Sequence, residues 1–281
     1  MFSSINDSSV MLSNDLKNKL PIIRINGVGK QFVQKYLRLD FFINSIKEKY
    51  FYMSAPSKWD DPLETKYLDF LNNDNENKIS PEDLKELKNM YIFCSCMTYN
   101  DSDNEEASWR SYDSDREQVI RISYDFNKLC GILKKEKIFI GEVKYKPRKE
   151  IISWTPVNYK ILSNNNNRNE VLFVNNFCYK QDAYRYEKEL RFCIIHCGKH
   201  YQNLDSYVIK DIDLTPAVIQ ITLPPINYNK LDEAEKNSKL REQIKMYSLL
   251  KKLCPDATIC VSNLYNPNEI TMTSVFNPKT K

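Results

Sequence analysis

Glycine is scarce in this sequence, with only five residues among 281. Nucleotide-binding loops of the Rossmann and P-loop kinds need glycine because their backbone approaches the phosphates closely. The segment "NGVGKQF", at residues 26–32, has neither a third glycine nor the G-K-[ST] ending. The sequence therefore excludes both kinds of loop, and a bound nucleotide would have to be held in another way.

Long apolar runs and a strong excess of charge are also absent. Runs such as "AVIQITLPP", at residues 217–225, are far shorter than the ~20 residues of a membrane helix. The N-terminus lacks the basic and apolar regions of a secretory signal. The net charge of +4 gives no electrostatic reason to expect nucleic acid as a partner. We expect a cytoplasmic protein without a membrane partner, although export by a specialised system would leave no mark in the sequence.

Metal-binding spacings are missing as well. Cys94 and Cys96 form a C-x-C, and Cys193 and Cys197 lie four apart beside His196, but no C-x-x-C pair occurs. Both groups fall in apolar, strand-like runs and not in the loops typical of zinc sites. The pattern predicts buried free thiols and no metal.

What the sequence does contain is typical of a globular protein, with 42% hydrophobic and 12% aromatic residues. Alternating or continuous apolar patterns predict strands, and apolar residues three and four apart predict helices. In the strand at 50–54, Tyr50, Tyr52 and Ser54 share one face. The expected strands are 32–38, 50–54, 91–99, 117–126, 184–195, 217–223 and 257–262, with a further strand pair or bend at 137–146. The expected helices are 39–49, 80–90 and 231–253.

This order of elements predicts a single α+β domain over residues 31–281. We expect a mixed, mostly antiparallel central sheet flanked by helices. Residues 1–30 read as an N-terminal extension, and polar insertions fall near 69–88 and 161–169. The helix at 231–253 has an apolar stripe of Leu240, Ile244, Tyr247 and Leu250, which Leu249 and Leu253 widen near its end. This helix is expected to pack on the sheet, with binding of a partner as the alternative.

Three segments could carry chemistry. They are the turn "WDDPLE" at 59–64, the group "SWRSY" at 108–112, and one face of the strand at 184–195. On that face Glu187 and Glu189 would point the same way between Arg185 and Arg191. Neighbouring carboxylates raise one pKa, whereas the arginines lower both. A solvated ladder of ion pairs would explain the same pattern.

These segments resemble the bacterial domain of unknown function family 2971. The likeness covers residues 33–262 and lies in "KYLRLDFFINSIKEKYFYMSAPSKWDDPLE", "YIFCSCMTY", "ASWRSYDSDREQVIRISYDF" and "YRYEKELRF". Trp59 and Asp60 stand where the family usually has phenylalanine and asparagine, and Tyr184 stands for a tryptophan. The family name implies no function.

One reaction class suits a site without glycine loops or histidines. Cleavage of the nicotinamide–ribose bond of NAD passes through an oxocarbenium-like state, as glycoside hydrolysis does. Its leaving group is already cationic, so a carboxylate that stabilises positive charge is enough and no general acid is needed. The layout resembles ADP-ribosyltransferases, in which a polar residue, a tyrosine or serine, and a late E-x-E glutamate come from successive strands.

That resemblance implies an NAD-dependent ADP-ribosyltransferase-like or NAD-cleaving enzyme. Glu189 is the better match to the catalytic glutamate, with Glu187 beside it. NAD or a related nucleotide would be the ligand, and a protein could be the acceptor. The residues expected to contact NAD are Arg38, Tyr36, Tyr52, Ser54, Trp59, Trp109 and Tyr112.

Two alternatives stay open. A metal-dependent hydrolase or nuclease could hold Mg²⁺ with Asp60, Asp61, Glu64 and Glu187. However, Asp61 before Pro62 is equally typical of a cap or Asx turn. A non-enzymatic binding module would instead use Trp59, Trp109 and Tyr112 as core or interface aromatics.

Overall fold

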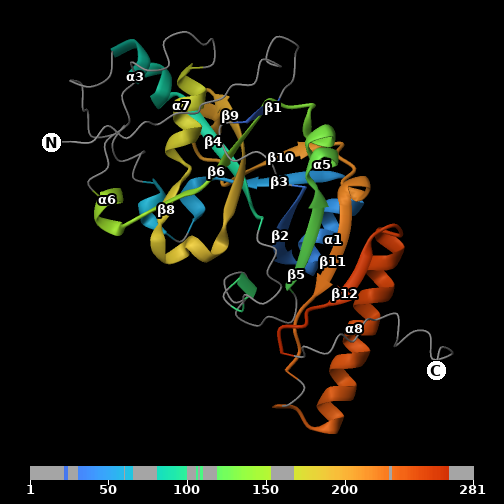
Figure 1. The fold of residues 1–281 in the computed structure, drawn as a ribbon. Helices are drawn as coiled ribbons and strands as arrows, with labels where there is room; N and C mark the ends of the chain where they lie inside the picture. The colour runs from blue at the N-terminus through green and yellow to red at the C-terminus, as the bar shows by residue number, and fades with distance from the viewer. Residues whose placement is uncertain are drawn as a thin grey trace.

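The computed structural model describes residues 22–24, 31–59, 61–65, 81–99, 106, 108–109, 119–152, 168–227 and 230–265. These residues build one large mixed sheet with helices against it (Figure 1). Its main path runs β1 (Ile22–Arg24), β6 (Ile138–Glu142), β9 (Glu189–Cys197), β4 (Met90–Thr98), β2 (Phe32–Arg38), β5 (Val119–Asp125), β11 (Val218–Leu223) and β12 (Thr258–Val261). Within the described part of this large sheet only β1–β6 and β11–β12 are parallel, which confirms the predicted α+β class with a mostly antiparallel sheet.

Helices and short 3₁₀ turns connect these strands. The helices are α1 (Leu39–Lys47), α3 (Pro81–Lys88), α5 (Phe126–Leu133), α6 (Arg148–Ile152), α7 (Arg168–Asn176) and α8 (Glu233–Leu253). The 3₁₀ turns are η2 (Pro56–Lys58), η3 (Pro62–Thr65), η5 (Asp182–Glu187), η6 (Lys199–Tyr201) and η7 (Thr215–Ala217). Helix α8 begins with a capping box, in which Asp232 and Glu235 satisfy each other's backbone N–H groups. Among the described residues, no helix is long and apolar enough to span a membrane.

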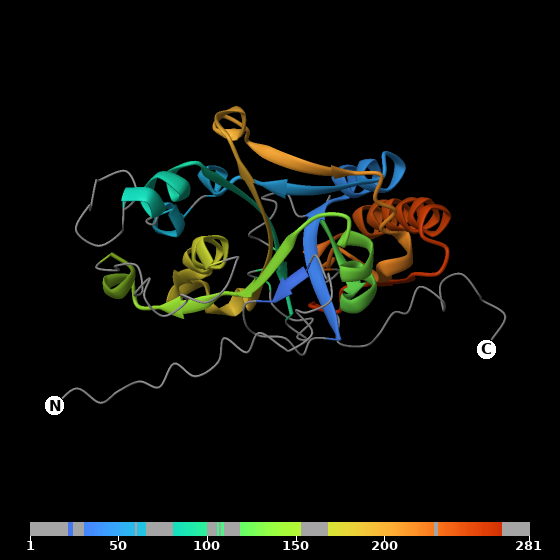
Figure 2. The ribbon, with the colours of Figure 1, turned by 90° about the horizontal axis from the view of Figure 1, so that it is seen from above.

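The sheet divides at β4. One edge of β4 pairs with β9 along its whole length, whereas the other edge touches β2 only at Gln34–Thr98 and β3 (Tyr50–Ser54) only at Ser54–Cys94. Strand β3 then pairs with β10 (Ser206–Lys210), and the two run away from β2 and β5 (Figure 2). Lys35 reaches into this fork and donates to Ser95, and burial lowers its pKa to about 8.

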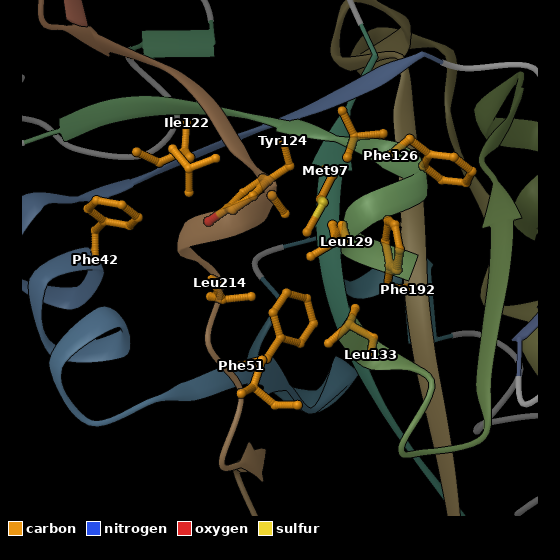
Figure 3. Close-up of a cluster of buried hydrophobic side chains, with 14 of the residues drawn as sticks. Phe42, Phe51, Met97, Ile122, Tyr124, Phe126, Leu129, Leu133, Phe192 and Leu214 are labelled. Carbon is orange, nitrogen blue, oxygen red and sulfur yellow. The ribbon is translucent and has the colours of Figure 1, made fainter. Parts of the chain in front are cut away.

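The largest hydrophobic cluster of the described residues lies between the β3–β10 pair and strands β2 and β5. Side chains from β3, β4, β5, β9 and α5 meet there, among them Phe51, Leu129 and Phe192, all of which are buried (Figure 3). A smaller cluster on the opposite face of β4 and β9 packs under α7, around Phe139, Phe173 and Phe177. Because apolar layers cover both faces, any charged side chain on these central strands must find its partners inside the protein.

Most predicted elements are confirmed with small shifts at their ends. Strands β2 and β3 and helix α1 lie where the pattern placed them, and β3 buries Phe51 and Met53 while Tyr52 stays exposed. The predicted strand at 91–99 is β4, in the middle of the sheet. The stripe of α8 is confirmed at Leu250, which is fully buried, but Leu249 remains 37% exposed and does not widen it.

Three predictions about chain organisation need correction or limits. Residues 22–24, placed in an N-terminal extension, form β1 and pair with β6. The end of the insertion near 69–88 is helix α3, which confirms the helix predicted at 80–90, and the insertion near 161–169 meets the described residues only at 168–169, where α7 begins. The predicted strand at 184–195 is wrong in its first half, because residues 182–187 form η5 and β9 begins at Glu189.

Candidate charged site

The E-x-E motif lies at the junction between η5 and β9. Lys188, between the two glutamates, adopts the left-handed conformation with φ 42° and ψ 57°. This bend ends the 3₁₀ turn and starts the strand, so Glu187 and Glu189 are not alternate residues of one flat strand. Arg185 points instead to Asp182, with 68% of its side chain exposed, and is not part of the site. The predicted four-residue face is therefore wrong, and so is the solvated ladder, because Glu189 and Arg191 are buried.

Arg191 is the centre of a buried ion-pair network. Its side chain is fully buried, with Nε 2.7 Å from Glu189 Oε1 and Nη2 3.1 Å from Glu189 Oε2. It also contacts the Glu64 carboxylate and donates to the carbonyl of Phe177. The Trp59 ring lies 4.2 Å from the guanidinium carbon. Such planar, bidentate pairing with an aromatic ring beside it suits arginine and would not suit lysine.

Lys180 joins the same network from β8 (Tyr179–Gln181), which pairs with β7 (Lys144–Lys146). Its Nζ lies 3.1 Å from Glu64, 2.7 Å from Glu187 and 3.4 Å from Glu189. The Tyr184 ring covers the ammonium group with its centroid 4.7 Å away. One lysine therefore contacts Glu64 and the two glutamates of the E-x-E motif, which lie more than a hundred residues further along the chain.

We call this group the charged cluster, and it consists of Glu64, Lys180, Glu187, Glu189 and Arg191. Three carboxylates face two cations, so the ionised cluster has a net charge of −1. In a partly buried place an unbalanced charge is felt more strongly than in water. The cluster is thus suited to meet positive charge brought by something else.

The two glutamates of the motif differ in exposure. The side chain of Glu189 is 5% exposed and that of Glu187 is 17% exposed. Both oxygens of Glu189 are already bonded, Oε1 by Arg191 and Oε2 by Arg191 and Lys180. Among the described residues Glu187 has Lys180 as its cationic partner, and it lies on the side of the cluster nearer to solvent. Glu187 is therefore at the open end of the cluster, and Glu189 at its closed end.

The pKa values diverge for the same reason. Burial alone would raise the pKa of Glu189, but Arg191 and Lys180 outweigh it and bring the value down to about 2. Burial raises the pKa of Glu187, and Lys180 offsets this only in part. Burial would lower the pKa of Lys180, yet the carboxylates around it hold the value above its usual range. Glutamates two residues apart whose pKa values are pushed in opposite directions are typical of separate roles in one site.

Two tyrosines, Tyr145 and Tyr184, contact residues of the charged cluster. The hydroxyl of Tyr145 accepts a hydrogen bond of 2.9 Å from the backbone N–H of Glu189, which fixes the start of β9. Tyr145 and Tyr184 are both half-buried, and burial raises the pKa of each hydroxyl, so both stay neutral donors or acceptors. Two neutral tyrosines therefore lie against the charged cluster, one at the Glu189 backbone and one at the Lys180 ammonium group.

The turn before the cluster is structural in the way its sequence suggested. Asp61 accepts from the backbone N–H of Leu63 at 3.0 Å and so caps η3, which places Glu64. Gln181 donates to both oxygens of Asp61, at 3.0 and 2.9 Å. Among the described residues no group of His, Cys, Asp or Glu could hold a metal ion. Asp60, which the metal alternative needs, lies outside the described residues.

The residues expected to contact NAD fall into separate places. Ser54 and Trp59 join the charged cluster, since the Trp59 Nε1 donates to Ser54 Oγ at 3.2 Å while its ring covers Arg191. Tyr36 and Trp109 pack edge to face, 5.0 Å between centroids, in a different buried cluster. Tyr52 is exposed, and Arg38 pairs with Asp40 at the surface. Tyr112 lies outside the described residues.

The sequence also left site residues unnoticed. Lys180, Tyr145 and Gln181 lie on short strands with no periodic pattern long enough to identify. The one signal was compositional, because "CYKQDAYRYEKE" brings cations, acids and tyrosines together within twelve residues. The eight cysteines are free, as predicted, and Cys94 and Cys193 are buried.

A comparison with protein families supports the motif assignment. A family model described as "Protein of unknown function (DUF2971)" matches residues 108–192. The matched segment includes "SWRSY", Lys180 and both glutamates of the E-x-E motif, and it supports the resemblance that the motifs indicated over these residues. No curated protein and no solved structure matches the chain.

Proposed function

We propose that this chain binds NAD and cleaves the bond between nicotinamide and ribose, passing ADP-ribose to water or to a protein acceptor. One observation carries the proposal: the charged cluster has one negative charge in excess, and Glu187 presents its open end. Cleavage of a glycosidic bond of this kind builds positive charge on the ribose. A fixed negative charge in a partly dry place lowers the energy of that state.

In this proposal Glu187, and not Glu189, faces the ribose. Glu189 was the better match to the E-x-E pattern, but its oxygens are already bonded to Arg191 and Lys180. Turning either oxygen toward a ligand would break a buried ion pair, which costs several kcal/mol. Glu187 can turn toward a ligand by giving up Lys180 alone, and Lys180 would keep Glu64 and Glu189.

The other members of the cluster are positioning residues. Lys180 and Arg191 hold Glu189 ionised, and both cations also pair with the Glu64 carboxylate. Tyr184, beside the Lys180 ammonium group, offers an aromatic surface next to Glu187. Because nicotinamide leaves as a neutral molecule, no residue has to protonate it, which agrees with a site built without histidine.

The test is release of nicotinamide from NAD, followed by chromatography, with and without candidate acceptor proteins. Glu187→Gln should reduce release by at least about 100-fold, the effect of removing one charge-stabilising group, while the protein stays folded. Glu242→Gln is the matched control, because Glu242 lies half-exposed on α8, far along the chain from the cluster, and should release nicotinamide at the wild-type rate. Absence of release by the wild-type protein under all conditions, or unchanged release by Glu187→Gln, would refute the proposal.

A further inference from the structure

Two buried thiols are in contact near Arg191 of the charged cluster. Cys94 on β4 and Cys193 on β9 have their sulfur atoms 3.2 Å apart, and the Cys94 thiol donates to the Cys193 sulfur. Both residues are at most 1% exposed. Each of the eight cysteines is free, so this contact is between reduced thiols.

The strand register places this pair well for a covalent bond. Cys94 and Cys193 are direct partners in the antiparallel β4–β9 ladder. Residues directly opposite in such a ladder have Cα atoms about 4.5–5.5 Å apart, within the range of disulfides, about 4.4–6.8 Å. Strands β4 and β9 are paired over nine residues on this edge, so no backbone movement is needed to bring the thiols together.

We propose that Cys94 and Cys193 are a modification site that a hydroperoxide converts to a cross-strand disulfide. One thiolate attacks the terminal oxygen of the hydroperoxide and the O–O bond breaks, which gives a sulfenic acid, while the other oxygen takes up the proton lost by the thiol and leaves as an alcohol, or as water from hydrogen peroxide. The neighbouring thiol then attacks the sulfenic sulfur, the S–O bond breaks, and water leaves with the second thiol proton as the S–S bond forms. Overall two thiols and one hydroperoxide give one disulfide, one water and one alcohol, or two waters with hydrogen peroxide.

The strand register favours a bond between Cys94 and Cys193 over a bond to another thiol. Cys178 is another buried thiol in this region, but it directly precedes β8 and does not pair with either strand residue. Burial raises the pKa of Cys193, so the first step is slow and proceeds through local opening of the strands. The site therefore responds to sustained oxidant, unlike the exposed Cys197, which reacts first.

The disulfide would form next to the charged cluster. Arg191 and Cys193 lie on the same face of β9, two residues apart, and Ser54 donates to the carbonyl of Cys94 at 3.4 Å. Linking the two strands fixes the part of the sheet that carries both groups. This inference stands on the thiol geometry alone and does not depend on NAD cleavage.

The experiment treats the full-length reduced protein with hydrogen peroxide, blocks the remaining thiols with N-ethylmaleimide after denaturation, and maps the peptides by mass spectrometry. We expect a linked peptide that contains Cys94 and Cys193, no alkylation of these two thiols, and return of their alkylation after treatment with dithiothreitol. The oxidised protein should unfold several degrees higher, because the link closes a long loop in the unfolded chain. Cys193→Ser should give no linked peptide, and the control Cys254→Ser should give the wild-type link.

The wild-type peptide map decides the question even if Cys193→Ser fails to fold. Alkylation of both Cys94 and Cys193 at peroxide doses that fully oxidise Cys197 would overturn the proposal. So would a link from Cys94 to Cys178.

Discussion

The two ends of the charged cluster show how one short motif can serve two purposes. At the closed end Glu189 is held by Arg191 in a fully buried ion pair. At the open end Glu187, two residues earlier, has more of its side chain in contact with solvent and a raised pKa. The difference arises from the bend at Lys188 and from Lys180, which contacts both ends. Position in the fold, and not residue type, decides which carboxylate holds the structure together and which can meet a ligand.

Removing the cation of the closed end should have the largest effect. Arg191→Met would leave Glu64 and Glu189 buried without their arginine, so we expect the free energy of unfolding to fall by about 3–5 kcal/mol. Denaturant unfolding measures it. Arg185→Met is the matched control, since Arg185 is largely exposed and should cost less than about 1 kcal/mol. Equal losses in both variants would mean that the cluster does not stabilise the fold.

Acid should weaken the closed end next. The pKa of Glu189 falls from 4.5 to about 2 on folding, a difference of about 3 kcal/mol. Because the folded value is the lower one, this stability is complete above about pH 4.5 and is lost as the pH falls toward 2. Glu187 has the opposite sign, since its raised pKa means that protonation favours the folded state. Unfolding measured from pH 6 to 2 should show a steep loss that Glu189→Gln flattens and Glu187→Gln does not.

A smaller effect is expected at the aromatic wall of the closed end. Trp59→Leu removes the ring over Arg191 and the indole N–H that Ser54 accepts, so the free energy of unfolding should fall by about 1–2 kcal/mol. Trp59→Phe keeps a ring and should recover part of that loss. If Leu and Phe behave alike, the ring contact with Arg191 contributes nothing.

The smallest effect concerns the bend between the two ends. Lys188 has a positive φ, which is costly for a residue with a side chain, so Lys188→Gly should be neutral or stabilise by up to about 1 kcal/mol. Lys188→Val should destabilise, because a β-branched residue resists this conformation. Thermal unfolding distinguishes them, and a less stable Lys188→Gly variant would contradict the strained bend.

Much of the fold followed from local pattern. The alternation in residues 50–54 predicted β3, and the helical spacing after Leu39 predicted α1. Both predictions succeeded because the apolar residues of each element recur at regular intervals within one short segment. The cap role of Asp61 was also visible, since aspartate before proline commonly opens a turn. Local physical preferences decide these features, and tertiary contacts did not override them.

The site was less predictable because its contacts are long-range. The "YRYEKELRF" segment alternates like a strand, but the 3₁₀ turn and the positive φ at Lys188 interrupt it, and no glycine or proline marks the break. Lys180 reaches Glu64 across more than a hundred residues of sequence, and no periodic pattern reports such a contact. The E-x-E pair could therefore be found from sequence, whereas the roles of its two glutamates could not.

The most direct test of this division is a carboxyl-detected NMR titration of the wild-type protein with selectively labelled glutamate. Glu189 should titrate near pH 2, and Glu187 should titrate above the ordinary value of 4.5. Assignment rests on the signal lost in Glu187→Gln. Titration of both carboxyl groups in the same range, or Glu189 above Glu187, would contradict a closed structural end and an open end available to a ligand.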